Sequence, residues 1–256
     1  SDFGGKVGTA SFAMSMLREG TSSRSSQDIA EQLETLGTNL STSASIDSSR
    51  ISMDSLVSNL APSLDIFADV IENAAFASDE IERKRANWIE SIKKEKASPT
   101  SQAIRILPGL IFGENHAYGV PLTGSGTQQS ITSLSREDLI SYRDTWLRPD
   151  NARLVIVGAT TEAEIKPLLE QALNDWNAPA APKPTKQFTA LAKQDSPRVF
   201  IINQPGTPQS TILAGHLAPS DRVENADVLD VTNTILGGSF TSRMNMNLRE
   251  DKGWSY

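Results

Sequence analysis

Residues Gly237–Tyr256 read GGSFTSRMNMNLREDKGWSY. A glycine pair ends an apolar run, and Thr241 or Ser242 stands where a helix N-cap is expected. Apolar residues then recur at helical spacing as far as Lys252-Gly253, a cation and a glycine that are typical of a helix C-terminus. The pattern predicts a short helix, after which residues 254–256 leave as an extended strand.

Arg249 and Tyr256 flank this predicted corner. A guanidinium and a phenol can both donate hydrogen bonds to one carbonyl oxygen or oxyanion. The same spacing also fits an ordinary amphipathic helix with a surface arginine and a core tyrosine. The residues alone leave both interpretations open.

The stretch resembles a segment of the inverzincin zinc metallopeptidases, family M16, which includes pitrilysin, insulinase and mitochondrial processing peptidase. That family segment reads Gly-Gly-x-x-x-Ser-Arg-Leu, then Leu-Arg-Glu-x-x-Gly-x-x-Tyr, and the match here is long and nearly gapless. In the family it lies in the half of the molecule that carries no metal, and its later Arg and its Tyr reach toward the scissile carbonyl at the other half's zinc. The resemblance implies that Arg249 and Tyr256 are substrate-binding residues.

Residues Gly8–Thr21 resemble the family's zinc-binding helix, Gly-x-Ala-His-x-x-Glu-His-Met-x-x-x-Gly-Thr. The spacing of the motif is kept, but Ser11 and Ser15 replace its two histidines and Met14 replaces its general-base glutamate. The family spacing of about 76 residues to the distal glutamate ligand falls on Ser91. Serine hydroxyls are poor Zn²⁺ ligands and a thioether cannot take a proton from a bound water. The resemblance therefore implies a degenerate motif, with no complete catalytic site, no metal and no cofactor in this chain.

Other candidate ligands have ordinary interpretations. Glu90 is next to Ser91 but points about 100° away around a helix. With Glu82 and Glu95 it stands among Lys and Arg, which is typical of a solvated helix face with i,i+4 pairs. The chain's two histidines, His116 and His216, each lack a second ligand at helical or loop spacing, so we expect surface or hydrogen-bonded roles for them.

The composition is that of an ordinary globular protein large enough for two domains, with 256 residues, 38% of them hydrophobic and 21% charged. A net charge of −7 argues against a nucleic-acid surface or an anionic membrane face. Absence of cysteine excludes disulfides and thiolate metal sites. No apolar run has the length of a membrane span and no signal-like segment opens the sequence. Because the family has strands before the zinc helix and continues past the Arg/Tyr corner, we expect a fragment of a longer polypeptide.

Residue periodicity predicts a series of helices, over 7–17, 25–37, 61–75, 78–96, 135–146, 165–176 and 225–236. Alternation predicts a hairpin of 38–46 and 49–57 and strands over 151–159, 198–203 and 209–216. This order predicts an α+β fold, with an antiparallel sheet covered by helices. The resemblance implies duplicated M16 peptidase-like (LuxS/MPP-like) domains. We expect a degenerate N-terminal-type domain over 1–178, a Pro/Ala-rich linker over 179–187, and over 188–256 the start of an incomplete second domain that carries the Arg/Tyr motif.

These features predict a non-catalytic (pseudopeptidase) subunit of a heterodimeric zinc metallopeptidase. The chain is no enzyme alone; its expected partners are a homologous active chain, which carries the zinc, and a peptide substrate, with neither nucleic acid nor membrane. The alternative is a structural scaffold or peptide-holding protein, like the family members in respiratory complexes. An autonomous peptidase fits the sequence least. The cysteine-free, Ser/Thr/Asn-rich composition favours the periplasm, with the cytoplasm as the alternative compartment.

Overall fold

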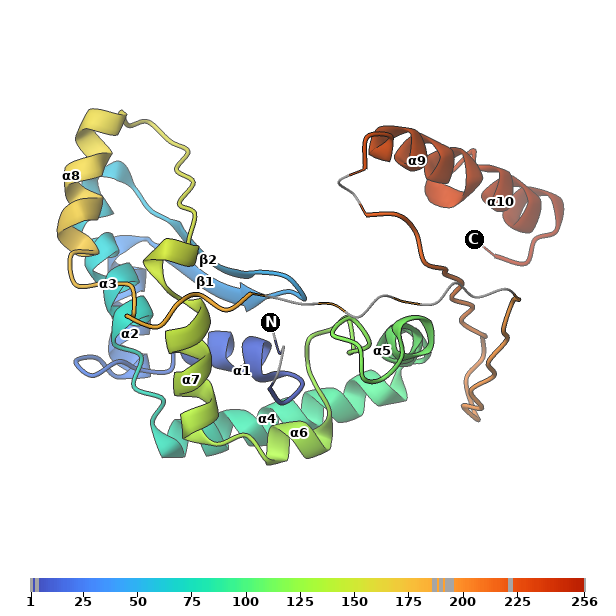
Figure 1. Cartoon of the computed structure of the whole chain (residues 1–256), viewed down its shortest axis with the longest axis horizontal. Coiled ribbons are helices and arrows are strands. Elements are labelled where there is room, and N and C mark those ends of the chain that lie inside the picture. The colour runs from blue at the N-terminus through green and yellow to red at the C-terminus, as the bar shows by residue number, and fades with distance from the viewer. Residues whose placement is uncertain are drawn as a thin grey trace. The chain divides into compact units, whose positions relative to one another are not determined.

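The structure is a computed structural model, and it describes residues 2, 5–185, 188, 191, 196–220 and 223–255. The chain forms two compact units, Ser1–Gly215 and His216–Tyr256 (Figure 1). The domain boundary expected within 179–187 stays a prediction.

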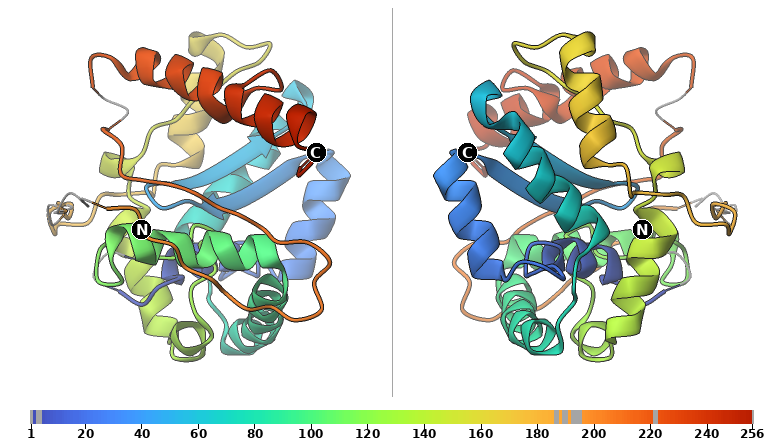
Figure 2. Two further views of the ribbon diagram at one scale, coloured as in Figure 1. Left: turned by 90° about the vertical axis from the view of Figure 1, so that its right-hand side faces the viewer. Right: turned by 90° about the vertical axis from the view of Figure 1, so that its left-hand side faces the viewer.

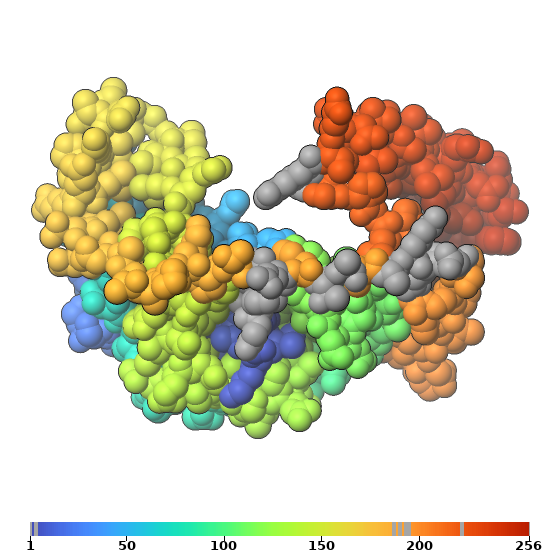
Figure 3. Space-filling model, viewed as in Figure 1, coloured from blue at the N-terminus to red at the C-terminus, as the bar shows by residue number. Residues whose placement is uncertain are grey.

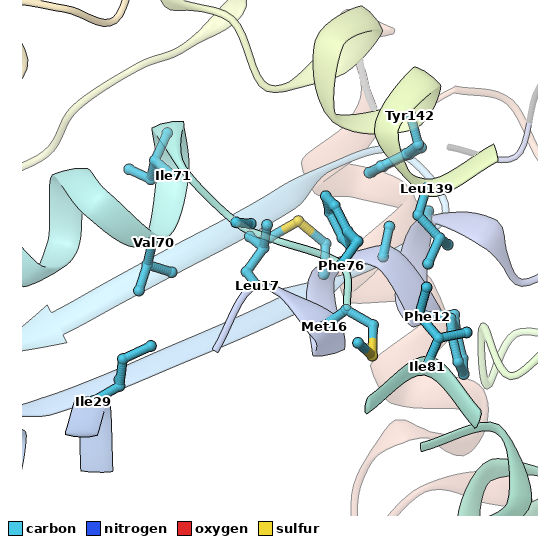
Figure 4. Packing of buried hydrophobic residues seen from close by; sticks show 14 of the residues in the cluster. Phe12, Met16, Leu17, Ile29, Val70, Ile71, Phe76, Ile81, Leu139 and Tyr142 are labelled. Atoms are coloured by element: carbon cyan, nitrogen blue, oxygen red, sulfur yellow. The ribbon is translucent and has the colours of Figure 1, made fainter. Parts of the chain in front are cut away.

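The first unit is built around the helix α1 (Thr9–Met16). The Asp2 carboxylate accepts hydrogen bonds from the backbone N–H groups of Gly8 and Ala10 at 2.6 and 2.7 Å, which satisfies donors that a helix N-terminus leaves free. Phe12, Met14 and Met16 are fully buried, whereas Ser11 and Ser15, four residues apart on one face, are half-buried. Figure 4 shows Phe12, Met16 and Leu17 packed among side chains of the surrounding elements. The helix predicted over 7–17 is confirmed, and most of its residues are buried.

Two helices and a hairpin follow α1 in the chain, and the first strand of the hairpin packs against α1. A capping box between Ser25 and Asp28 starts α2 (Ser26–Leu36), and Gly37, at φ 61°, ends it. The strands β1 (Asn39–Ala44) and β2 (Ser49–Asp54) pair antiparallel. The short helix η1 (Val57–Asn59) leads into α3 (Leu60–Glu72), which packs against α2 (Figure 2). The predicted hairpin and both predicted helices are confirmed.

The long helix α4 (Ser78–Ala97) is followed by α5 (Pro99–Phe112), a helix that the sequence analysis does not predict. Pro99 and Pro108 both lie in α5, and proline inside a pattern argues against a helix. Pro99 is tolerated because it occupies the first helical position. The chain continues through α6 (Gln128–Thr132), also not predicted, to the predicted helix α7 (Arg136–Trp146). A capping box between Ser135 and Asp138 starts α7.

The three strands expected beyond α7 are not formed. After η2 (Pro149–Asn151), residues 152–159 run as an irregular connection to α8 (Glu162–Ala172), and Val155 and Val157 are exposed. Residues 198–203 and 209–216 are likewise irregular, and Val199, Ile201 and Ile212 are exposed. A strand needs a neighbour for its backbone hydrogen bonds, and within the described residues β1 and β2 are the only paired strands. The α+β class is nevertheless confirmed: helices accompany one antiparallel sheet.

The second unit contains four consecutive helical segments: α9 (Ala226–Asn233), η3 (Thr234–Gly238), α10 (Arg243–Asn245) and η4 (Met246–Asp251). They confirm the helices expected on both sides of the glycine pair. None of the helices that the structure describes, in either unit, combines the length and the apolar composition needed to cross a membrane.

Candidate functional site

The first candidate site is the face of α1 that carries the degenerate metal-binding positions. Ser11 and Ser15 are half-buried, and the Ser15 hydroxyl donates to the Phe12 carbonyl oxygen at 2.8 Å. Met14 has no exposed surface and belongs to the hydrophobic core. The side chains at these positions therefore serve the helix and its packing.

Ser91, the fourth position, lies on α4 and is exposed. Its hydroxyl donates to the carbonyl oxygen of Asn87 at 3.1 Å, one turn earlier. Helices α1 and α4 contact each other through Phe12 and Trp88, whose rings meet edge to face at 5.4 Å. Trp88 lies one turn before Ser91, so the fold brings the two helices together at the expected place.

The loop Thr123–Gly126 packs directly on α1, a feature for which the sequence analysis found no signal. Gly124 lies so close that a Cβ on it would be 2.5 Å from the Ser11 hydroxyl oxygen. A Cβ on Gly126 would be 2.4 Å from the Val7 carbonyl oxygen. Both glycines have φ near 70°, a conformation that other residues rarely adopt. Figure 3 shows dark blue atoms of the N-terminal segment between the yellow-green and the green parts of the first unit.

A buried ion pair holds this loop. Arg105 of α5 donates to Glu95 of α4 and to the Ser125 hydroxyl, both at 2.5 Å, and to the Gly126 carbonyl oxygen at 2.5 Å. Trp88 adds a hydrogen bond from its indole N–H to the Ser125 carbonyl oxygen at 2.9 Å. The loop is thus tied to two helices at the point where it covers α1.

These residues do not fit a zinc ion. Two hydroxyls already donate to backbone carbonyls, a thioether is sealed in the core, and the Gly124 backbone lies against the remaining hydroxyl. Zinc sites in proteins use imidazole, thiolate or carboxylate ligands. Across the described ranges, no three His, Cys, Asp or Glu side chains come together as a group that could hold a metal ion.

The sequence predicts that the acidic residues of α4 lie on a solvated helix face with i,i+4 pairs, and the structure agrees only in part. Glu90 pairs with Lys93 at 2.7 Å on exposed surface, and the exposed Glu82 pairs with the mostly buried Arg85 at 3.1 Å, both at i,i+3 spacing. The solvated-face interpretation is wrong for Glu95, which is mostly buried against Arg105. The sequence could not show this, because the partner comes from another helix.

Both histidines have hydrogen bonds. The His116 ring nitrogen Nδ1 accepts from the backbone N–H of Tyr118 at 3.1 Å. The exposed His216 has its Nδ1 2.7 Å from the Leu217 carbonyl oxygen. The surface or hydrogen-bonded roles expected for them are confirmed.

The second candidate site is the corner that carries Arg249. The Ser242 hydroxyl accepts from the Asn245 N–H at 3.3 Å, so Ser242 is the N-cap. Gly253, at φ 62°, follows the helix end, and the Trp254 N–H donates back to the Leu248 carbonyl oxygen at 2.8 Å. The chain therefore turns at Trp254, and the extended strand expected there is wrong for this residue.

The Arg249 side chain is 37% exposed. Its guanidinium lies over the Phe240 ring at 4.8 Å and 3.5 Å from the Glu250 carboxylate. This stacking fixes the planar group while its edge stays available for further hydrogen bonds. Tyr256, the other predicted substrate-binding residue, lies outside the described residues.

The fold agrees with the comparisons to known proteins. Residues 5–117 match the model of insulinase, peptidase family M16, and residues 133–256 match the model of the peptidase M16 inactive domain. The chain belongs to peptidase family M16.

Individual relatives are distant. An uncharacterized zinc protease of Bacillus subtilis is 25% identical over 97% of this chain and 58% of its own length. A peptidase M16 inactive domain from Pseudomonas fluorescens has a similar structure, with a TM-score of 0.78 and 24% identity over 100% of this chain and 61% of that one. The periplasmic protease PqqL of Escherichia coli is similar over 73% of this chain and 21% of its own, with a TM-score of 0.63 and 17% identity. The chain thus spans little more than half of the B. subtilis relative.

Proposed function

We propose that this chain is the non-catalytic subunit of a heterodimeric zinc peptidase. It closes the chamber around a peptide held by a homologous chain that carries an intact metal site. The observation that carries the proposal is the contrast between the two candidate sites. The metal positions Ser11, Met14, Ser15 and Ser91 lack zinc ligands, whereas the Arg249 segment keeps the family pattern except for Met244, which stands at its leucine.

In this proposal Arg249 and Tyr256 bind the substrate. A zinc ion in the partner supplies Lewis acidity and an activated water. The guanidinium and the phenol of this chain donate to the scissile carbonyl oxygen or to the neighbouring substrate backbone. Their hydrogen bonds strengthen as negative charge develops on that oxygen, so the chain contributes to the reaction without holding metal. The exposed edge of Arg249 and its support by Phe240 favour this role.

A scaffold or peptide-holding protein is the second candidate. The absence of zinc ligands at the four metal positions fits a scaffold equally well. A scaffold, however, has no chemical need for a supported arginine at the family's substrate-binding position. We place the complex in the periplasm, because the cysteine-free chain suits that compartment and a structurally similar E. coli protease is periplasmic.

Substitutions at the corner, tested on the reconstituted pair of chains, distinguish the two candidates. Tyr256→Phe removes one hydroxyl and keeps the ring, and Arg249→Lys keeps the charge but loses the planar fork. We expect each to lower kcat/KM by about 100-fold, the scale seen for oxyanion donors. The matched control is Lys252→Ala, which removes an exposed neighbouring cation and should leave kcat/KM unchanged. If both corner variants stay within about two-fold of wild type, less than about 0.5 kcal/mol of barrier, the scaffold function is correct.

A further inference from the structure

Three aromatic rings gather where α5 ends and residues 113–119 begin. Phe112, His116 and Tyr118 form what we call the aromatic cradle. The His116 ring stacks on Phe112 at 5.5 Å, and the Tyr118 ring lies 5.6 Å from Phe112 and 5.7 Å from His116. All three residues are half-buried, so the cluster is part of the surface of the first unit and not of its core.

The cradle is fixed by its own backbone. A Cβ on Gly119 would be 1.9 Å from the Gly113 carbonyl oxygen, so the loop closes only with glycine there. Gly119 N–H donates to the His116 carbonyl oxygen at 2.8 Å. His116 Nδ1 accepts the Tyr118 N–H at 3.1 Å, which fixes the orientation of the imidazole ring. The Tyr118 hydroxyl donates to Asp47, in the turn between β1 and β2, at 3.0 Å. Rings held in this way lose little freedom when a ligand binds.

One further ring already lies on the cradle. Phe188 belongs to no helix or strand, yet its ring stacks on Tyr118 at 5.1 Å with an interplanar angle of 17°. It also lies 6.3 Å from the His116 ring. Phe188 is 47% exposed, so the cradle covers only part of it. The contact is therefore a stacked side chain on a preformed surface, the geometry with which aromatic rings bind one another.

We infer that the aromatic cradle is a binding site for an aromatic side chain of an extended peptide, and that Phe188 is its internal occupant. The Tyr118 hydroxyl and His116 Nδ1 are already in hydrogen bonds, so the cradle offers ring faces and favours an aromatic ligand over a charged one. Phe188 is tethered to the same unit, and a tethered ring competes with an added peptide at an effective concentration in the millimolar range. The inference rests on the proposed function, in which this chain encloses a peptide, and its test needs neither the partner chain nor turnover.

The experiment measures binding of a single-phenylalanine peptide, acetyl-Gly-Gly-Phe-Gly-Gly-amide, to the isolated chain. The reporter is the His116 ring proton resonance, followed by NMR; the chain has two histidines, and His216→Gln removes the other signal. Phe188→Ala should tighten binding by about three-fold or more, because the internal competitor is gone. Adding Tyr118→Ala to that variant should weaken binding by about ten-fold, whereas Tyr118→Phe, which keeps the ring, should preserve it.

Phe200→Ala is the matched control, since Phe200 is also an exposed aromatic residue outside the cradle, and it should not change affinity. The same peptide with alanine in place of phenylalanine should not shift the His116 resonance. Unchanged affinity in Phe188→Ala would overturn the inference and make Phe188 a structural clip. Equal binding of the alanine peptide, or of Tyr118→Ala, would also overturn it. A loss of peptidase activity in the reconstituted pair has no bearing on this result, so the two proposals fail separately.

Discussion

Met14 shows at the residue scale why this chain cannot be restored to a peptidase by one change. The family has a glutamate at this position, and here the side chain has no exposed surface. A carboxylate placed there would lose its hydration without a partner, which costs several kcal/mol or forces it to bind a proton. The sequence predicts the loss of chemistry at Met14. It does not predict that the loop at Gly124 also occupies the space beside Ser11.

Asp69 gives a residue-scale prediction of pH dependence. Burial acts to raise the pKa of its carboxyl group, but hydrogen bonds from Thr21, Arg24, Asn73 and Ser23 outweigh burial and hold the pKa below the ordinary 3.8. A lowered pKa in the folded state stabilises the protein above the unfolded-state pKa, and this stabilisation is lost as the pH falls through the folded-state value. We therefore expect Asp69→Asn to lower the free energy of unfolding at pH 7. The difference from wild type should shrink below about pH 4.

Urea denaturation at a series of pH values measures this difference. Asp54→Asn is the control, because Asp54 is exposed at the end of β2 and its substitution should change the free energy of unfolding little. If the difference in free energy of unfolding between Asp69→Asn and wild type stays constant from pH 7 to pH 3, the charge of the carboxylate does not contribute to stability.

At the scale of elements, local signals were sufficient for most helices and for the hairpin. Ser25, Ser135 and Thr161 each start a helix with a capping box, and the hairpin needs only its own two strands. The strand predicted over 151–159 failed because its residues satisfy the pattern of a buried strand, whereas pairing depends on a neighbour that the pattern cannot supply. The sequence analysis did not predict α5, because two prolines lie within its range and proline is unfavourable inside a helix.

In the candidate sites, too, local signals predict elements but not the contacts between them. The corner helix at Arg249 was predicted from its cap and its glycine, which are local signals. The ion pair between Glu95 and Arg105 joins two helices, and the contact of Phe188 with Tyr118 joins residues far apart in sequence. Neither contact has a spacing that a single sequence reveals.

Arg105 gives the prediction that belongs to this scale, since it joins α4, α5 and the loop over α1. Arg105→Ala leaves the mostly buried Glu95 without its cation, so we expect the free energy of unfolding to fall by about 3 kcal/mol. The loop should also open, and amide hydrogen exchange at Ser125 and Gly126 measures that directly.

The matched control is Lys93→Ala, which breaks the exposed pair with Glu90 on the same helix. It should change the free energy of unfolding by less than about 0.5 kcal/mol. Equal, small effects of the two substitutions in chemical denaturation would mean that the buried pair does not hold the loop.

At the scale of the whole molecule, the chain matches two models of one peptidase family and spans 58% of the length of a curated zinc protease. Its metal positions hold side chains that serve packing and backbone hydrogen bonds, and its second unit keeps the arginine segment. The proposed function explains these features by a partner chain that holds the zinc. Permanent complexes commonly bury upward of about 2,000 Å², so co-expression with an active homologue should give one heterodimer peak on a sizing column.

The central claim is that this chain raises the activity of a zinc-bearing partner while having none itself. The direct measurement is kcat/KM for one peptide substrate with the active homologue alone, with this chain alone, and with both, at the same zinc concentration. We expect no turnover from this chain alone and a rise of about 100-fold or more when it is added to the homologue, as two transition-state donors are supplied. A kcat/KM within two-fold of the homologue alone would contradict the account, and so would zinc-dependent turnover by this chain by itself.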